Sequence, residues 1–161
     1  ENWSRIHRVA RSRGLETPAV LRYGHADGPR ARVDHLLRLR ELQDETAGLR
    51  VVVVVHDQAQ PATPAESLQT VAISRLLLDN ITHLECDRET HELSLVQLSL
   101  NFGADDLGGA SDAAHRDELL DLARDAGFTP VERDARYEVV RQYEAPTPLA
   151  ERRREPQPMW S

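Results

Sequence analysis

Histidine and carboxylate side chains follow the predicted ends of several strands, where α/β proteins usually carry their chemistry. They fall into four groups: His25, His56 with Asp57, Cys86 with Asp87, and Asp105 with Asp106. Because the carboxyl ends of parallel strands meet at one edge of a sheet, the four groups predict a shared site at one rim. The competing interpretation is that loops are polar in any case, so that the groups have no common role.

Each group allows more than one kind of chemistry. His25 follows Gly24, which permits close backbone approach, so His25 is a candidate for binding a carboxylate or for acid–base work. His56 is a candidate rim residue, either a metal ligand or a satisfied polar group at a strand end. Asp105 and Asp106 are candidates for binding ribose hydroxyls or a cation, or for capping the next helix. A metal-dependent hydrolase would use His25, His56 and Asp105 as ligands.

The composition excludes several classes of site. The 161 residues carry a net charge of −7, and all 20 basic residues are arginine, so no lysine is present for a Schiff base or a phosphate loop. The acidic balance and an aromatic content of 4% argue against nucleic acid as a partner. A single cysteine, Cys86, allows no disulfide within the chain. The longest valine run is far too short to span a membrane, and a cytoplasmic protein with no membrane partner is expected.

Apolar spacing predicts alternating helices and short strands. Strands are expected near 18–23, 50–56, 81–86 and 100–104; helices are expected before Gly14, from Pro64, and over 29–46, 89–99 and 113–126. Five consecutive valines, Val51 to Val55, cannot alternate between faces, which indicates a strand covered on both sides in a parallel sheet. After these come an extended segment over 128–133, a peripheral helix over 134–143, and a proline- and arginine-rich tail over 144–161 that we expect to be disordered.

The fold class is therefore α/β, with about four strand–helix units in one domain, residues 1–143. Such units form either a small open sheet or half of an eight-fold βα barrel. A half barrel would have two open edges, near strands 18–23 and 100–104. Open edges expose unpaired backbone groups and recruit partners.

Several stretches carry a more specific signal than apolar spacing, because their residues match the motifs of a known family. They are 23–25 with 33–46, then 70–80, and finally 102–108 with 132–141. Together these motifs resemble the C-terminal half of radical-SAM enzymes of the futalosine menaquinone pathway, above all the aminofutalosine synthases. The dehypoxanthinyl futalosine cyclases and the deazaflavin-cofactor synthases are more distant relatives. The resemblance covers residues 3–143.

The resemblance implies a half barrel of the TIM type and a radical reaction. In the family, a four-iron four-sulfur cluster held by a Cys-x-x-x-Cys-x-x-Cys loop in the N-terminal half cleaves S-adenosylmethionine, and the adenosyl radical adds to an enolpyruvyl-oxybenzoate. By position, His25, Asp105 and Asp106 match motif residues at the substrate rim. The cluster cysteines do not occur in this sequence, so no cofactor, no catalytic residue and no metal ligand is expected in this chain, which would be inactive alone.

Three departures from the family pattern support an alternative. The family's Phe-Ile-Pro-Leu-like strand is replaced by Val51 to Val55, its aromatic stretch by Glu85 to His91, and a threonine by Ala110. These changes fit a diverged, non-catalytic half barrel that associates with itself or binds a partner. The expected partner is an N-terminal half-barrel chain or, in a homodimer, a second copy.

Overall fold

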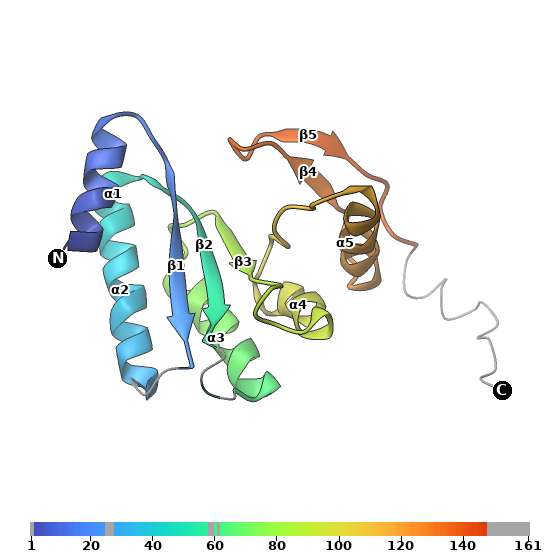
Figure 1. The fold of residues 1–161 in the computed structure, drawn as a ribbon, viewed down its shortest axis with the longest axis horizontal. Coiled ribbons are helices and arrows are strands. Elements are labelled where there is room, and N and C mark those ends of the chain that lie inside the picture. Colours follow the sequence, from blue (N-terminus) through green and yellow to red (C-terminus); the bar gives the residue numbers. More distant parts are fainter. Residues whose placement is uncertain (1, 25–27, 58–59, 61, 148–161) are drawn as a thin grey trace. The chain divides into compact units, whose positions relative to one another are not determined.

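The computed structural model describes residues 2–24, 28–57, 60 and 62–147 (Figure 1). The chain divides into two compact units, residues 1–109 and 110–161. The first contains a parallel sheet with helices, and the second contains a helix with an antiparallel ribbon. This mixed α/β content confirms the predicted class and is compatible with a partial βα fold.

Helices and strands alternate in the first unit. Its elements are α1 (Asn2–Ser12), β1 (Thr17–Tyr23), α2 (Gly28–Thr46), β2 (Leu49–His56), α3 (Pro64–Leu77), β3 (His83–Cys86), α4 (Leu93–Ser99) and the 3-10 helix η1 (Leu100–Phe102). The strands are parallel in the order β1-β2-β3. Three of the four predicted strands are thereby confirmed, with bounds that agree within two residues.

Helices cover one face of this sheet and form the core with it. Alternation along β2 turns Val52 and Val54 toward that face, where neither side chain has exposed surface. Leu36 and Leu39 of α2 and Val71 of α3 belong to the same buried cluster. Figure 1 shows α2 running alongside the strands. Burial of these side chains is the main favourable term for this unit.

The opposite face of the sheet is only partly covered. The register places Val20, Val53 and Glu85 in one row across β1, β2 and β3. Val20 is 43% exposed, and Val53 and Glu85 are half-buried. The valine strand is therefore fully buried on its helical face, whereas its other face is partly exposed among the described residues.

The predicted strand over 100–104 is wrong. Leu100 to Phe102 form η1, which continues directly from α4, and the amide of Ala104 donates to the carbonyl of Ser99 at 3.1 Å. Gly103, with φ of 105°, ends this helical segment in the left-handed conformation that commonly stops helices. Extended pairing appears only two residues later, as a single parallel bridge between Glu85 and Asp106.

Residues 110–161 form a separate unit built on α5 (Ala113–Asp125), β4 (Val131–Arg133) and β5 (Val139–Gln142). The helix predicted over 134–143 is wrong, because β4 and β5 pair as an antiparallel ribbon. The carboxylate of Asp134 accepts from the amides of Arg136 and Glu138, and Tyr137 has φ of 63°. Such a turn reverses the chain before the β-branched residues of β5. The extended segment predicted over 128–133 corresponds to β4.

Two remaining expectations concern the helix before η1 and the tail. Helix α4 begins at Leu93 rather than at 89, since Thr90 and His91 are held in a turn by Asp87. Most of the tail, 148–161, lies outside the described residues. In the described part of the chain, no helix combines the length and apolarity needed to cross a membrane.

Candidate functional site

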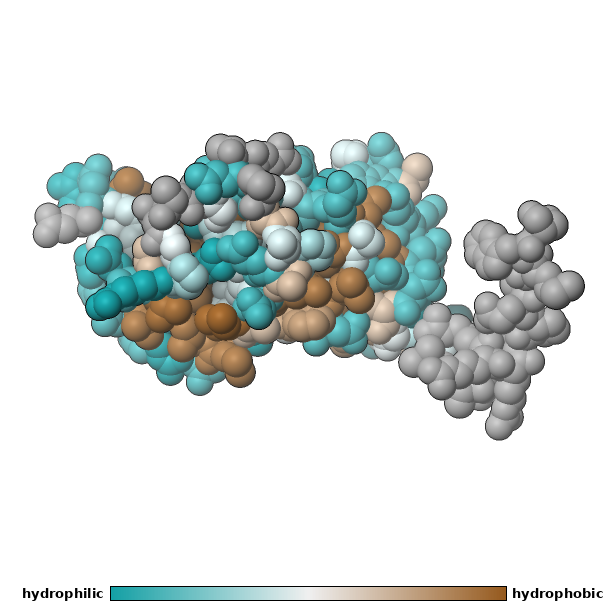
Figure 2. Space-filling view, turned by 90° about the horizontal axis from the view of Figure 1, so that it is seen from below, coloured by the Kyte–Doolittle hydropathy of each residue, from teal (hydrophilic) through white to brown (hydrophobic). Residues whose placement is uncertain are grey.

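The carboxyl ends of β1 and β2 meet the start of the loop after β3 at one edge of the sheet. Backbone hydrogen bonds extend the ladder into the loops: the amide of Asp57 donates to Tyr23 at 2.7 Å, and that of Asp87 donates to Val54 at 3.1 Å. The residues that follow the strands are therefore held side by side, as the spacing predicted. Figure 2 looks onto this edge, where hydrophilic and hydrophobic residues are interspersed.

The predicted rim residue His25 lies outside the described residues, but its neighbour Gly24 is described. Gly24 has φ of 90°, and a side chain on it would place Cβ only 2.8 Å from Cδ2 of His56. The end of β1 therefore passes directly against the His56 ring, which only glycine permits. His56 itself is held by contacts within the protein: Nε2 lies 2.9 Å from the carbonyl of Gln60, and its amide donates to Thr90.

A cluster of three rings lies beneath this rim. The centroid of the Tyr23 ring is 5.3 Å from that of His56 and 5.8 Å from that of His91. The Tyr23 hydroxyl lies 2.8 Å from Nε2 of His91 and 2.7 Å from Oγ of Ser67. Burial raises the pKa of Tyr23 to about 12 and lowers the pKa of His91, so both groups are neutral at pH 7.

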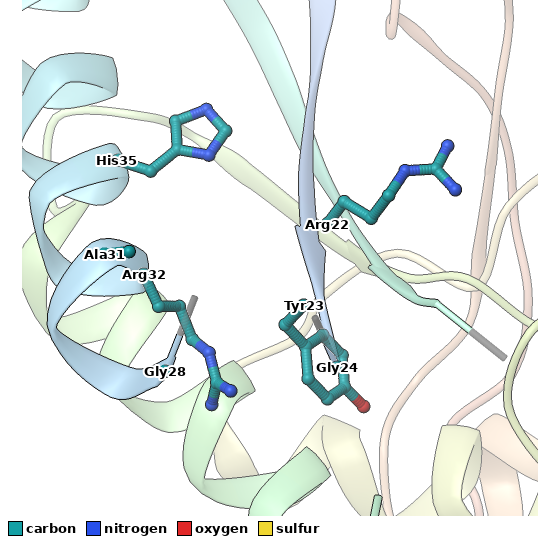
Figure 3. A pocket seen from close by; sticks show the side chains of 7 residues that line it. All are labelled: Arg22, Tyr23, Gly24, Gly28, Ala31, Arg32 and His35. Atoms are coloured by element: carbon teal, nitrogen blue, oxygen red, sulfur yellow. The ribbon is translucent and has the colours of Figure 1, made fainter. Parts of the chain in front are cut away.

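Two hollows flank the ring cluster. A crevice of about 400 Å³ is lined by residues that include His56, Ser67, Glu89, Thr90, His91 and Leu95. A smaller hollow of about 240 Å³ lies between the end of β1 and the start of α2. Figure 3 shows Arg32 reaching from α2 toward Tyr23, with His35 farther along the same helix, while Arg22 extends on the other side of the strand. The guanidinium of Arg32 lies 5.0 Å from the centre of the Tyr23 ring, a cation–π contact.

Asp105 ties the loop after η1 to the sheet and to α3. One carboxylate oxygen accepts from Arg75 (2.9 Å) and from the amide of Leu84 (2.8 Å), and the other lies 2.6 Å from Nδ1 of His83. Arg75 also donates to the carbonyl of Gly103 at 2.7 Å. Both oxygens of Asp105 are therefore engaged by the protein itself. This arrangement suits a residue that positions the loop.

Asp106 lies beside a carboxyl group that motif reading did not single out, that of Glu85. Burial, and after it the neighbouring carboxylates of Asp106 and Asp87, raise the pKa of Glu85 to about 7, against the opposing effect of Arg88. Gly108 donates its amide to Asp106 at 2.9 Å, and a Cβ on Gly108 would lie 2.8 Å from the Glu85 carboxyl. The loop thus closes tightly over a carboxyl group that can hold a proton near neutral pH.

The sequence contained a signal for Glu85, although a weak one. Leu84 and Cys86 are buried on the helical face, so strand alternation turns Glu85 to the opposite face, next to Val53. A carboxyl group at such a position is expected to be partly desolvated. Its neighbour Asp106 comes from a loop 21 residues later in the sequence, which strand alternation alone does not reveal.

The described residues contain no group of three or more His, Cys, Asp or Glu side chains able to hold a metal ion. Within that part of the chain, His56 and Asp105 therefore belong to no metal cluster. The third proposed ligand, His25, lies outside it. Among the described residues, the rim offers hydrogen-bonding and proton-holding groups.

Similar proteins identify the relatives of this chain, although no family model matches it. It is 45% identical to the aminodeoxyfutalosine synthase of Streptomyces coelicolor over 99% of this chain and 49% of that protein. It is 33% identical to the cyclic dehypoxanthine futalosine synthase of the same organism, over 94% of this chain. A 5-amino-6-(D-ribitylamino)uracil–L-tyrosine 4-hydroxyphenyl transferase of Methanopyrus kandleri is 32% identical over 89%.

The matches also show that this chain is shorter than its relatives. The chain spans about half the length of the curated relatives it matches. The first match extends over 192 aligned positions against 161 residues here, so at least 31 positions of that relative have no counterpart within the matched stretch. The resemblance that the motifs predicted is confirmed: over nearly its whole length this chain is a relative of the aminodeoxyfutalosine synthases.

Proposed function

We propose that this chain forms the substrate-rim part of an aminodeoxyfutalosine-synthase-like radical enzyme. The observation that carries the proposal is the 45% identity along 99% of the chain, combined with coverage of about half of the relative. The reaction class is addition of an adenosyl radical to an enolpyruvyl-oxybenzoate, followed by decarboxylation. This chain would contribute polar groups of the rim, and the remaining part of such an enzyme would contribute the cofactors.

The residues of this chain do not fit the iron–sulfur cluster of that chemistry. Such a cluster requires several cysteine thiolates, and the sequence contains one cysteine. Cys86 has no exposed surface and faces the core, and burial raises the pKa of its thiol to about 11. It is a neutral, packed side chain at pH 7.

The proposed roles of the rim residues follow from their surroundings. His25, Asp105 and Asp106 are the candidates for substrate binding by family position, and His56 lies at the same rim. The contacts of Asp105 with Arg75 and His83 favour a positioning role, in which it presents Asp106 beside Glu85. Glu85, with Asp106 beside it, would then hold or exchange a proton close to a bound substrate.

The test joins this chain to the part of a relative that it does not match. The complementary part of the Streptomyces coelicolor protein, with its cluster assembled under anaerobic conditions, is mixed with the chain, and formation of aminodeoxyfutalosine from S-adenosylmethionine is followed by mass spectrometry. Product is expected with both parts and with neither alone. Asp106→Asn should lower the rate about tenfold or more, and Glu118→Gln, an exposed change on α5, should not. No product from the mixture, under conditions where the intact relative is active, would contradict the proposal.

One observation favours a second function, that of a non-catalytic module. At least 31 positions of the relative have no counterpart here within the matched stretch, so this chain lacks residues that the relative contains in the same part of the protein. The same mixture separates the two functions. A stable complex that forms no product, and does not consume S-adenosylmethionine, supports the module.

A further inference from the structure

A buried phenol lies against an imidazole beneath the rim. Tyr23 is 2% exposed, and its hydroxyl lies 2.8 Å from Nε2 of His91, a residue 68 positions later in the sequence. Nδ1 of His91 lies 2.6 Å from the carbonyl of Asp87, and a carbonyl can only accept, so the proton of the neutral ring is on Nδ1. Nε2 therefore carries a lone pair and accepts the phenolic proton of Tyr23.

This geometry prepares the phenol to lose a proton together with an electron. A base can take a proton when the two heavy atoms are about 2.6–3.2 Å apart, and Nε2 of His91 meets that requirement. After transfer, the imidazolium donates Nε2–H back to the phenoxyl oxygen. The hydroxyl of Ser67, 2.7 Å from the same oxygen, can turn its hydrogen toward it. Both products of the transfer are thus hydrogen-bonded within the protein.

The surroundings of the Tyr23 ring keep the phenol protonated until an electron leaves. Burial raises the pKa of Tyr23 to about 12, so the phenol does not ionise at pH 7. Arg32 lies 5.0 Å from the centre of the ring, where a lone cation would oppose the loss of an electron. Arg32 also donates to the carboxylate of Glu66 at 2.8 Å, so its charge is balanced. A radical formed on this ring is shielded from solvent.

Tyr143 in the second unit provides a contrast. Its hydroxyl donates to the carboxylate of Glu132 at 2.9 Å, so it also has a proton acceptor, but a carboxylate is a weaker base than an imidazole. The guanidinium groups of Arg141 and Arg124 lie 4.7 and 5.9 Å from the centre of the Tyr143 ring. Two cations beside the ring oppose the removal of an electron. Oxidation is therefore expected at Tyr23 in preference to Tyr143.

We propose that Tyr23 and His91 form a redox site, in which a one-electron oxidant takes an electron from Tyr23 and His91 takes the proton. The phenolic O–H bond breaks, and its proton forms a bond to Nε2 of His91. The products are a neutral tyrosyl radical, an imidazolium and the oxidant reduced by one electron, so charge and atoms balance. In an enzyme of the proposed function, the oxidant is an organic radical formed at the adjoining rim. Only this identity of the oxidant rests on the proposed function.

Photochemical oxidation of the full 161-residue chain tests the site. Ruthenium(III) tris-bipyridine, generated by a light flash in the presence of persulfate, is the oxidant, and electron paramagnetic resonance of the frozen sample detects the radical. Ring-deuterated tyrosine in the protein distinguishes a tyrosyl radical from a tryptophanyl radical. We expect a tyrosyl signal that Tyr23→Phe abolishes and that Tyr143→Phe, the matched control, leaves unchanged.

His91→Ala tests the proton acceptor. Without the imidazole, the yield of the tyrosyl radical should fall about tenfold or more. Because His91 lines the crevice of about 400 Å³, the variant opens a space in which free imidazole can replace the lost ring. Added imidazole should restore the radical, a rescue that is not expected if His91 serves only in packing. Circular dichroism confirms that each variant remains folded, and the rescue carries the test where Tyr23→Phe unfolds.

Three results would overturn the proposal: a radical confined to tryptophan, Tyr137 or Tyr143, a tyrosyl yield that His91→Ala leaves intact, or a loss in His91→Ala that imidazole does not restore. The measurement uses neither S-adenosylmethionine nor the remaining part of an enzyme, so its outcome is separate from that of the proposed function. A Tyr23 radical in a chain that forms no product with the complementary part retains the redox site and loses the enzyme.

Discussion

The two faces of the parallel sheet show how differently one set of strands can be used. On the helical face, Leu21, Val54 and Leu84 have at most 1% of their surface exposed. On the other face, at neighbouring positions of the same strands, Val20 is 43% exposed and the carboxyl of Glu85 is only half-buried. The helical face is a fully buried core, whereas the other face combines apolar residues with the Glu85 carboxyl, whose pKa is raised to about 7.

This difference separates stability from function in the molecule. Residues on the helical face are fixed by close packing, so changes there affect folding. Residues on the other face, and the loop that carries Asp106 and Gly108 over Glu85, gain less from packing and are available for chemistry. The candidate rim thus lies where the first unit can tolerate strain and charge.

The largest contrast is expected between two adjacent residues of β1. Leu21→Ala removes a side chain with no exposed surface and leaves a cavity, so it should lower the free energy of unfolding by about 3 kcal/mol. Val20→Ala, on the other face, should lower it by less than about 1 kcal/mol. Urea unfolding followed by circular dichroism measures both. Equal losses would mean that the second face is packed as tightly as the first.

Asp105 provides the next largest effect, because it joins the two faces through the loop. Asp105→Ala leaves Arg75, His83 and the amide of Leu84 without their carboxylate partner, which should cost about 2 kcal/mol. Asp106→Ala removes the carboxylate that accepts a hydrogen bond from the amide of Gly108, and should cost under about 1 kcal/mol. If Asp105 serves only to bind substrate, its replacement will leave the urea midpoint unchanged.

Much of the first unit could be predicted because its signals are local and strong. The valine run marks β2, Pro64 suits the first turn of α3, and apolar residues at helical spacing, among them Leu36 and Leu42, mark α2. The segment 100–104 could not be assigned in this way. A short apolar run fits a strand or a helix end, and the left-handed conformation of Gly103 decided for the helix.

The candidate site could be predicted in position but only partly in chemistry. Ends of parallel strands share an edge whatever their residues, so the rim followed from strand order alone. The partners of Asp105 could not be predicted from strand order. Arg75, for example, lies 30 residues earlier in the sequence and contacts Asp105 only because α3 packs beside the loop. Likewise, the proton affinity of Glu85 depends on its burial and on a bridge to Asp106, and neither is a local property.

The titration of Glu85 predicts a pH dependence of stability. Its pKa in the folded protein is raised to about 7 from the ordinary value of 4.5, so the folded state binds the proton more tightly than the unfolded state. Stability should therefore fall as the pH rises from about 4.5 to 7 and stay low above that range. Glu85→Gln should abolish this loss and raise stability at pH 8 by about 1 kcal/mol, after allowance for solvent screening.

The control is Glu89→Gln, which changes an exposed carboxyl in the loop after β3 and should leave the profile of stability against pH as it is. Urea midpoints measured every half pH unit from 4 to 8 give both curves. A Glu85→Gln curve parallel to that of the unmodified protein would show that Glu85 is solvated and ionised like any surface glutamate.

The smallest effect concerns the loop that closes over Glu85. Gly108 has φ of 75°, and a Cβ there would lie 2.8 Å from the Glu85 carboxyl, so Gly108→Ala should cost about 1 kcal/mol. Gly109→Ala meets nothing within 4 Å and should cost almost nothing. Combining Gly108→Ala with Glu85→Ala separates the two causes. The contact disappears in the double variant, so any remaining cost of Gly108→Ala measures the backbone conformation alone, and additive losses would show that the loop does not rest on Glu85.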